Sequence, residues 1–271
     1  MTRKRLNPVH IAVPTAFYDD ETLNADGTLA HIRHLIARGA KSLMLCGSTG
    51  EQHSLDFAEK LALLAALEAA NLPDDVEIIF GVAAIRQSHA IELAKAIAQS
   101  EVVDAILLGF PPYLRPTQNQ ALAYAEAILQ TAQKPCIVYN NPERTGFDLS
   151  VESAVQLANN PYLIGFKDPS DLAKLRAKIG DDWHYFCGGD MDIAEKLQQG
   201  YNGVSSQLGN LYPDLLQNYV AELLAGEMPS ENLDHKVQDF YRGSWLVRLK
   251  QQLGMGICRS PLLDLVADRV E

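Results

Sequence analysis

Short apolar runs alternate along this chain with longer segments in which apolar residues recur about every 3.6 positions. Such runs predict β-strands, and the 3.6-residue spacing predicts amphipathic helices. The strand candidates begin at His10, Ser42, Val76, Ala105, Cys136, Leu163, His184 and Gly203. Helical spacing is clearest over residues 55–70, 90–99, 121–132 and 193–199. The strand runs are almost continuously apolar, which is typical of parallel strands covered on both faces.

Eight such units in succession predict an α/β protein built as a (β/α)8 TIM barrel. The alternative is an open doubly wound sheet, which often carries a glycine-rich first turn. The first predicted strand is followed instead by AFYDDETLNADG, which contains no GxGxxG. We expect the barrel to span residues 1–227. Residues 228–271 are expected to form a C-terminal helical extension, interrupted at Gly254–Gly256, that is too short to bury a core of its own.

Length, charge and cysteine spacing narrow the function classes. The 271 residues carry a formal net charge of −11, which argues against binding to nucleic acid or to an anionic membrane. No apolar window is long enough to span a bilayer, and the N-terminus lacks the apolar region of a secretory signal. We therefore expect a cytoplasmic protein. Its four cysteines lie far apart without a CxxC pair, which predicts buried free thiols in a reducing compartment.

In a barrel of this type the active site forms where the strands end, at their carboxyl termini. The polar residues that close each apolar run are therefore the candidates for chemistry. They fall in the segments GSTGE at 47–51, FPPY at 110–113, YNNPERTG at 139–146, KD at 167–168 and GGD at 188–190.

Lys167 is the most informative of these residues. Alternation along LIGFK places Lys167 and Gly165 on one face, toward the barrel interior, with Gly165 leaving room below the lysine. Ile164 and Phe166 then face the surrounding helices. Burial in an apolar interior favours the neutral amine, which is a nucleophile that forms Schiff bases with ketones. The alternative is that the strand has ended and Lys167 reaches solvent or pairs with Asp168.

Other strand-end residues have chemistry that fits a site around Lys167. Tyr139 closes the neighbouring strand. A phenol there can relay protons at an imine. The alternative is that Tyr139 only packs against the barrel with its hydroxyl in water. The hydroxyl and backbone N–H groups of Ser48 and Thr49 suit a carboxylate, although a GSTG turn alone is weak evidence. Arg144 offers two parallel hydrogen bonds to a carboxylate, or is an exposed loop arginine.

Taken together, GSTGE, YNNPERTG and GFKD resemble the dihydrodipicolinate synthase/N-acetylneuraminate lyase family over roughly residues 8–225. The resemblance implies that Lys167 forms a Schiff base with pyruvate or another 2-oxo acid and that Tyr139 shuttles protons. It implies that Ser48 and Thr49 hold the pyruvyl carboxylate, with Thr49 also in the proton relay. It further implies the following roles: Tyr113 is lent across a tight dimer interface, Arg144 receives the carboxylate of an aldehyde, and Gly189 lines the substrate site.

Arg144 favours the synthase branch of the family over the lyase branch, although other positions depart from the usual synthase sequence. Arg144 is typical of the synthases, whereas Ser48 stands where they usually carry threonine. The segment FPPY replaces the usual TPYY, and Gln52 and His53 replace the small residues of the lysine feedback site. The leading hypothesis is condensation of pyruvate with aspartate 4-semialdehyde. The first alternative is cleavage or dehydration of a 2-keto sugar acid such as N-acetylneuraminate or 2-keto-3-deoxygluconate. The second alternative is a non-catalytic sensor that binds a 2-oxo acid.

No cofactor and no metal are expected beyond the covalent lysine imine. The only close histidine pair, His31 and His34, is expected on a solvated helix face. The expected partners are small-molecule substrates and further copies of the chain, as a homodimer or homotetramer.

Overall fold

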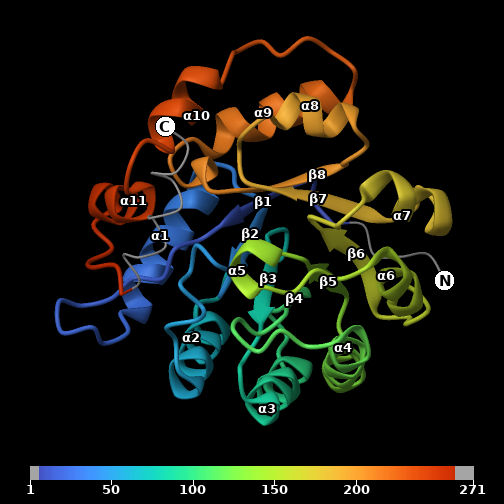
Figure 1. The fold of residues 1–271 in the computed structure, drawn as a ribbon. Coiled ribbons are helices and arrows are strands. Elements are labelled where there is room, and N and C mark those ends of the chain that lie inside the picture. The colour runs from blue at the N-terminus through green and yellow to red at the C-terminus, as the bar shows by residue number, and fades with distance from the viewer. Residues whose placement is uncertain (1–5, 260–271) are drawn as a thin grey trace.

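A closed barrel of eight parallel strands forms the centre of the computed structural model, which describes residues 6–259 (Figure 1). The strands follow chain order around the barrel, and β8 pairs with β1 to close it. Their bounds are β1 Val9–Ala12, β2 Ser42–Leu45, β3 Glu77–Val82, β4 Ala105–Gly109, β5 Cys136–Tyr139, β6 Leu163–Lys167, β7 His184–Gly188 and β8 Gly203–Ser206. The predicted (β/α)8 barrel is confirmed.

Helices surround the barrel and cover the outer face of the sheet (Figure 1). Their bounds are α1 Ala25–Ala37, α2 Phe57–Ala69, α3 Gln87–Ala98, α4 Gln118–Ala132, α5 Pro142–Thr145, α6 Val151–Leu157, α7 Leu172–Ile179, α8 Ile193–Gln198, a 3₁₀ turn η1 Leu208–Asn210, α9 Pro213–Leu224, α10 Asp234–Phe240 and α11 Trp245–Leu253. Local capping sets several of these starts. For example, Asp56 and Glu59 form a reciprocal capping box at the beginning of α2.

The first strand is shorter than the sequence predicts. The apolar run continues from His10 to Phe17, but β1 ends at Ala12. Pro14 has no N–H group to donate to a neighbouring strand, so the ladder stops close to it. Val13 still donates to the carbonyl of Met44, at 2.9 Å, before the chain turns away toward α1.

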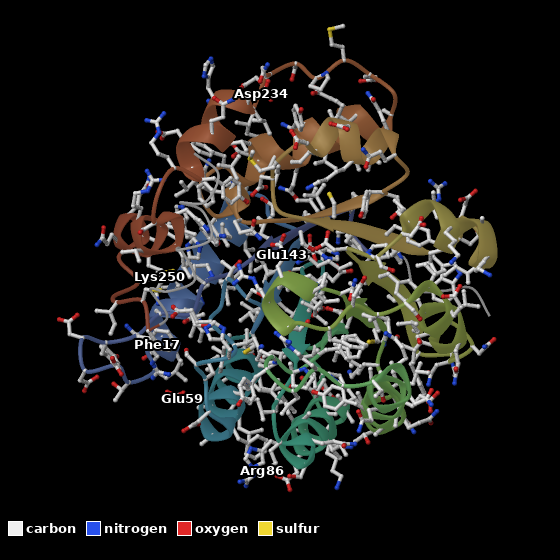
Figure 2. All side chains as sticks on the ribbon, viewed as in Figure 1. Phe17, Glu59, Arg86, Glu143, Asp234 and Lys250 are labelled. Carbon is white, nitrogen blue, oxygen red and sulfur yellow. The ribbon has the colours of Figure 1, made fainter. Side chains whose placement is uncertain are left out.

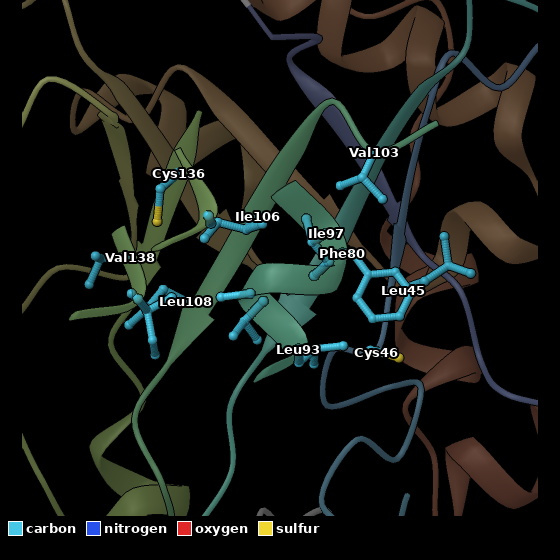
Figure 3. Close-up of a cluster of buried hydrophobic side chains, with 14 of the residues drawn as sticks. Leu45, Cys46, Phe80, Leu93, Ile97, Val103, Ile106, Leu108, Cys136 and Val138 are labelled. Atoms are coloured by element: carbon cyan, nitrogen blue, oxygen red, sulfur yellow. The ribbon is translucent and has the colours of Figure 1, made fainter. Parts of the chain in front are cut away.

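Two apolar layers hold the structure together. Inside the barrel, a small cluster fills the space between strands and includes Met44, Ile79, Leu107, Ile137 and Phe186. Outside it, a larger layer joins the strands to the helices, and Figure 3 shows its part between β3, β4, β5 and α3. Both layers exclude water from the strands, which explains their continuously apolar sequences.

Three of the four cysteines confirm the expected buried free thiols. Cys46, Cys136 and Cys187 are buried and Cys258 is partly exposed, and within residues 6–259 none of the four forms a disulfide. Burial raises the pKa of the Cys46 and Cys187 thiols to about 12 and also raises that of Cys136, so these thiols stay protonated at neutral pH.

The C-terminal helices pack against the last part of the barrel. Val237 and Phe240 of α10 and Leu249 of α11 share an apolar cluster with Leu216 and Val220 of α9. The predicted boundary at residues 227 and 228 falls in the connection between α9 and α10. Helix α11 ends at Leu253 and is capped by Gly254, whose φ of +66° lies in the left-handed region that glycine adopts easily. Residues 260–271 of the predicted extension lie outside the described residues.

Within residues 6–259, no helix combines the length and apolar character needed to cross a membrane.

Candidate active site

A cavity of about 780 Å³ opens at the carboxyl ends of the strands, where the sequence places the candidate residues. Six of the seven predicted site residues line it, namely Ser48, Thr49, Tyr139, Arg144, Lys167 and Gly189. They come from loops after β2, β5 and β7 and from the last residues of β5 and β6. Figure 2 shows Glu143 of the short helix α5 close to the middle of the barrel mouth, so this helix forms part of the rim.

Lys167 ends β6 with its side chain turned into the barrel mouth. The residue is 6% exposed, and its Nζ lies 3.7 Å from the centroid of the Tyr139 ring. Lys167 and Tyr139 are register partners on adjacent strands, which brings the two side chains together. The carboxylate of Asp168 lies 4.0 Å from Nζ, which makes a long ion pair beyond hydrogen-bond distance. The alternative in which Lys167 reaches solvent is therefore wrong.

The room for Lys167 comes from β7 rather than from its own strand. A Cβ on Gly188 would lie 3.2 Å from Cε of Lys167 and would overlap the carboxylate of Asp168. Gly165 has a different role, because a Cβ there would lie 2.6 Å from the Cβ of His184. The glycine seen to make room for Lys167 is thus Gly188 on the neighbouring strand, which alternation along one strand cannot reveal.

The predicted orientation of Ile164 is also wrong. Phe166 does face the helices, with its ring centroid 5.8 Å from that of Trp183. Ile164 instead belongs to the apolar cluster inside the barrel. The pairing register of β5 and β6 shifts between Cys136 and Ile137, and such a bulge breaks the strict alternation of faces.

Tyr139 presents its ring to the lysine and its hydroxyl to the next loop. The side-chain amide of Asn141 donates to the Tyr139 hydroxyl oxygen at 2.6 Å. The hydroxyl proton remains available to another acceptor in the cavity, because this contact uses only the oxygen as an acceptor. The arrangement suits a phenol that exchanges a proton with a bound molecule.

The turn after β2 offers donors for an anion. Within the described residues, the backbone N–H groups of Ser48 and Thr49 donate to no backbone carbonyl, and both residues line the cavity. The turn is closed by Glu51, whose N–H donates to the carbonyl of Ser48 at 3.0 Å. Cys46 and Glu51 flank it with φ of +52° and +51°, in the left-handed region. Free N–H groups and hydroxyls in a tight turn form an anion-binding concavity.

Gly81 on β3 allows this turn to approach the barrel. A Cβ at that position would overlap the carbonyl oxygen of Cys46, where the turn begins. Only glycine permits this close backbone contact.

Arg144 enters the site from α5. Asn141 caps this helix by accepting a hydrogen bond from the N–H of Arg144 at 3.2 Å, and Gly146 ends it with φ of +67°. The Arg144 side chain is exposed and lines both the main cavity and an adjoining one of about 350 Å³. Its guanidinium can therefore meet a carboxylate in either space.

Tyr113 is the predicted site residue that this chain does not bring to Lys167. Its side chain is 88% exposed, and its backbone has a left-handed φ of +75°. It lines neither the main cavity nor the adjoining one, although its neighbour Pro112 lines the latter.

The C-terminal helices supply site residues that the sequence reasoning missed. Tyr241, just after α10, and Trp245, the first residue of α11, line the main cavity. The Tyr241 hydroxyl contacts the Asp190 carboxylate at 2.8 Å and Gln207 Oε1 at 2.5 Å. No local motif marks Tyr241, because its partners lie 34 and 51 positions away in sequence.

Asp190 organises the wall of the cavity beside Gly189. Its carboxylate accepts hydrogen bonds from the hydroxyl of Ser206 and from the N–H groups of Gln207, at 3.0 Å, and Leu208, at 2.9 Å. Burial raises the pKa of the Asp190 carboxyl, although these donors oppose the shift. Burial and the nearby Asp190 also raise the pKa of Tyr241 well above its ordinary value. The network fixes the loop after β7 to the loop after β8.

Only one residue of the histidine pair on α1 lies on a solvated face, because His34 is exposed and His31 is not. His31 is buried, and its Nε2 lies 2.9 Å from the side-chain oxygen of Asn210 in the 3₁₀ turn η1. Among the residues described by the structure, no group of three or more His, Cys, Asp or Glu side chains is arranged to hold a metal ion.

Comparison with known proteins agrees with the geometry. The chain is 35% identical over 181 residues to the 4-hydroxy-tetrahydrodipicolinate synthase of Chlamydia trachomatis, a match that covers 66% of this chain and 62% of that protein. Among solved structures, a dihydrodipicolinate synthase from Cyanidioschyzon merolae with lysine bound matches with a TM-score of 0.83 and 22% identity. The superposition covers 98% of the present chain and 99% of the Cyanidioschyzon merolae chain.

A sialic acid aldolase from Ruminococcus gnavus shares the fold to the same degree. Its TM-score is also 0.83, at 21% identity, covering 94% of this chain and 90% of that one. Likeness at this identity shows the fold and does not separate the two activities. The sequence model of the dihydrodipicolinate synthetase family matches residues 5–246, nearly the whole described chain. The protein therefore belongs to the dihydrodipicolinate synthetase family.

Proposed function

We propose that this chain is a Schiff-base-forming lyase that condenses pyruvate with aspartate 4-semialdehyde, the activity of a 4-hydroxy-tetrahydrodipicolinate synthase. The observation that carries the proposal is the buried amine of Lys167, which lies over the Tyr139 ring inside the same cavity as the Ser48–Thr49 turn and Arg144. Family membership and the name of the chlamydial relative support it.

The first half of the proposed reaction activates pyruvate. The Lys167 amine adds to C2 of pyruvate, and the ketone oxygen leaves as water to give the imine. Tyr139 moves the protons that this exchange requires. Ser48 and Thr49 hold the pyruvyl carboxylate through hydroxyl and N–H donors, and Thr49 joins the proton relay. Loss of a proton from C3 then converts the imine to an enamine.

The second half forms the carbon–carbon bond. The enamine carbon attacks the aldehyde carbon of the semialdehyde, and the aldehyde oxygen takes a proton to become a hydroxyl. The amino group of the semialdehyde then displaces Lys167 from C2, which closes a ring and frees the lysine. Arg144 holds the distal carboxylate, and Gly189 leaves space at the wall of the site. Lys167 itself is the reactive group, so no cofactor enters these steps.

A second copy of the chain completes the proposed site. Tyr113 is 88% exposed and stands beside the adjoining cavity, where it is suited to enter the site of a neighbouring protomer. Mixing Tyr113→Phe chains with Lys167→Ala chains tests this. If two chains exchange Tyr113, one of the two sites in each mixed dimer has both Lys167 and Tyr113. Random pairing makes about half of the dimers mixed, so activity should return to about a quarter of the wild-type value. Two inactive parents that stay inactive after mixing would contradict the exchange.

Product analysis tests the proposed reaction. Pyruvate is incubated with a panel of aldehydes and the products are identified by mass, while borohydride reduction traps the imine on the protein. We expect a reduced three-carbon adduct at Lys167 and turnover with aspartate 4-semialdehyde. The Lys167→Ala and Lys167→Arg variants should give no adduct at this position, because neither has a primary amine. Pyruvate release from sugar acids instead would favour the lyase alternative, and an adduct without turnover would favour a 2-oxo acid sensor.

A further inference from the structure

A buried ion pair connects the C-terminal helix α11 to the turn that carries Ser48 and Thr49. The ammonium of Lys250 donates to Glu51 Oε1 at 2.8 Å, and both side chains are 0% exposed. The two residues are 199 positions apart in sequence. Lys250 belongs to α11, whereas Glu51 closes the turn after β2, so the contact fixes two distant parts of the chain to each other.

Phe17 holds the segment around Lys250 in place. The Lys250 ammonium lies 4.3 Å from the centroid of the Phe17 ring, a cation–π distance. The N–H of Phe17 donates to the carbonyl of Met255 at 3.1 Å, just beyond the end of α11. Gly256 follows with φ of +73°, and a Cβ there would overlap the carbonyl oxygen of Phe17. Figure 2 shows Lys250 and Phe17 on the same side of the barrel.

Backbone hydrogen bonds connect Glu51 to the turn that carries Ser48 and Thr49, so a shift of Glu51 would also shift the turn. Its N–H donates to the carbonyl of Ser48, and its own carbonyl accepts from the N–H of Ser54 at 2.8 Å. Its φ of +51° is a conformation that non-glycine residues adopt only where their surroundings hold them. The neighbouring Gly50 has little freedom, because its carbonyl accepts from the hydroxyl of Thr15 at 2.8 Å.

We propose that Lys250 is a positioning residue for the binding of the pyruvyl carboxylate. By holding the Glu51 side chain, it keeps the donors of Ser48 and Thr49 aimed into the cavity. This inference rests on the proposed function, in which that turn binds pyruvate. A buried ion pair is weak evidence for added stability, but its directional contact does fix geometry. Lys250 touches neither the substrate nor Lys167 in this scheme, so it acts only through Glu51.

The test measures how imine trapping depends on pyruvate concentration. Lys250→Met removes the ammonium but keeps a long side chain, and Glu51→Gln/Lys250→Met leaves no lone charge buried. We expect the half-saturating pyruvate concentration to rise between about tenfold and about a hundredfold, the effect of weakening one or two charge-assisted hydrogen bonds. The amount of adduct at Lys167 under saturating pyruvate should match that of the wild type, because the amine is unchanged.

Arg259→Met is the matched control. Arg259 also ties the C-terminal segment to the barrel, through Glu59 of α2 and through the other cation contact to Phe17, 3.9 Å from the ring centroid. Its nearest hydrogen bond to the turn is a long one, 3.4 Å from Nη1 to the carbonyl of Ser54, three residues beyond Glu51. Its loss should therefore leave half-saturating pyruvate within about twofold of the wild-type value. Circular dichroism melts confirm which variants are folded.

The possible outcomes separate this inference from the proposed function. If the wild type forms no imine with pyruvate, the proposed function fails and this inference fails with it. If the wild type forms the imine but the folded double variant saturates at the wild-type concentration, the role of Lys250 is refuted alone. An equal rise in Arg259→Met would also refute it, because a general loosening of the C-terminal segment would then explain the effect.

Discussion

Replacing Gly188 by alanine should displace Lys167 without altering its chemistry. The φ of Gly188 is not in the left-handed region, so alanine can adopt this backbone. The added Cβ would lie 3.2 Å from Cε of Lys167, against about 3.5–4.0 Å for an unstrained carbon contact. It would also overlap the carboxylate of Asp168, which now accepts from the Gly188 N–H at 2.7 Å. Both neighbours must therefore move.

The size of the effect follows from these distances. Relieving the contact requires the lysine to shift by several tenths of an ångström and requires Asp168 to turn away. A misplacement of about 1 Å at a reacting group costs on the order of a hundredfold in rate. We therefore expect imine formation to slow by about ten- to a hundredfold in Gly188→Ala. Overpacking at this position should also lower stability by about 1–3 kcal/mol.

Gly165→Ala separates the loss of stability from the displacement of the lysine. Its Cβ would crowd His184, at 2.6 Å, on the same pair of strands, and its three nearest neighbours all belong to that residue. We expect a lower melting temperature and a near-normal rate of imine formation. The assay is the rate of borohydride-trapped adduct at saturating pyruvate, with melting followed by circular dichroism. A wild-type rate in folded Gly188→Ala would refute the assignment of this glycine as the space for Lys167.

Three further predictions follow from the site and the core. Tyr139→Phe keeps the ring over Lys167 but removes the phenol, and steady-state turnover should fall by about 10²–10⁴-fold; near-normal turnover would leave Tyr139 a packing residue only. Arg144→Lys and Arg144→Ala should impair condensation with aspartate 4-semialdehyde far more than trapping of the pyruvate imine. Neither side chain can make the two parallel hydrogen bonds that arginine makes to the distal carboxylate. An equal loss in both assays would indicate a structural role for Arg144. Burial lowers the pKa of His10 from 6.5 to about 3, and Glu77 Oε1, 3.6 Å from its Nε2, lies beyond hydrogen-bond distance. Between about pH 6.5 and pH 3 the unfolded chain therefore binds a proton at His10 that the folded chain does not. The free energy of unfolding should fall as pH falls, by up to about 1.4 kcal/mol per pH unit. Urea titrations of wild type and His10→Leu should differ in this dependence of unfolding free energy on pH, and parallel slopes would contradict it.

The periodicity of the chain alone determined the barrel. Eight continuously apolar runs separated by helical spacing require parallel strands covered on both faces, and a closed barrel is how eight such units satisfy that requirement. Strand-end position then predicted which side chains meet at the mouth. Lys167 and Tyr139 were identified in this way because parallel strands of a barrel end at one edge, and register pairs the two residues directly.

Tertiary structure decided everything that depends on a neighbouring strand or a distant segment. The space for Lys167 comes from Gly188 across the β6–β7 pair, and the shifted register of β5 and β6 turned Ile164 inward. Tyr241 and Lys250 reach the site region from the C-terminal helices. Local patterns record only which face of an element is apolar. They carry no information about a contact made across nearly two hundred residues, because that contact exists only after the barrel closes and the last helices dock on it.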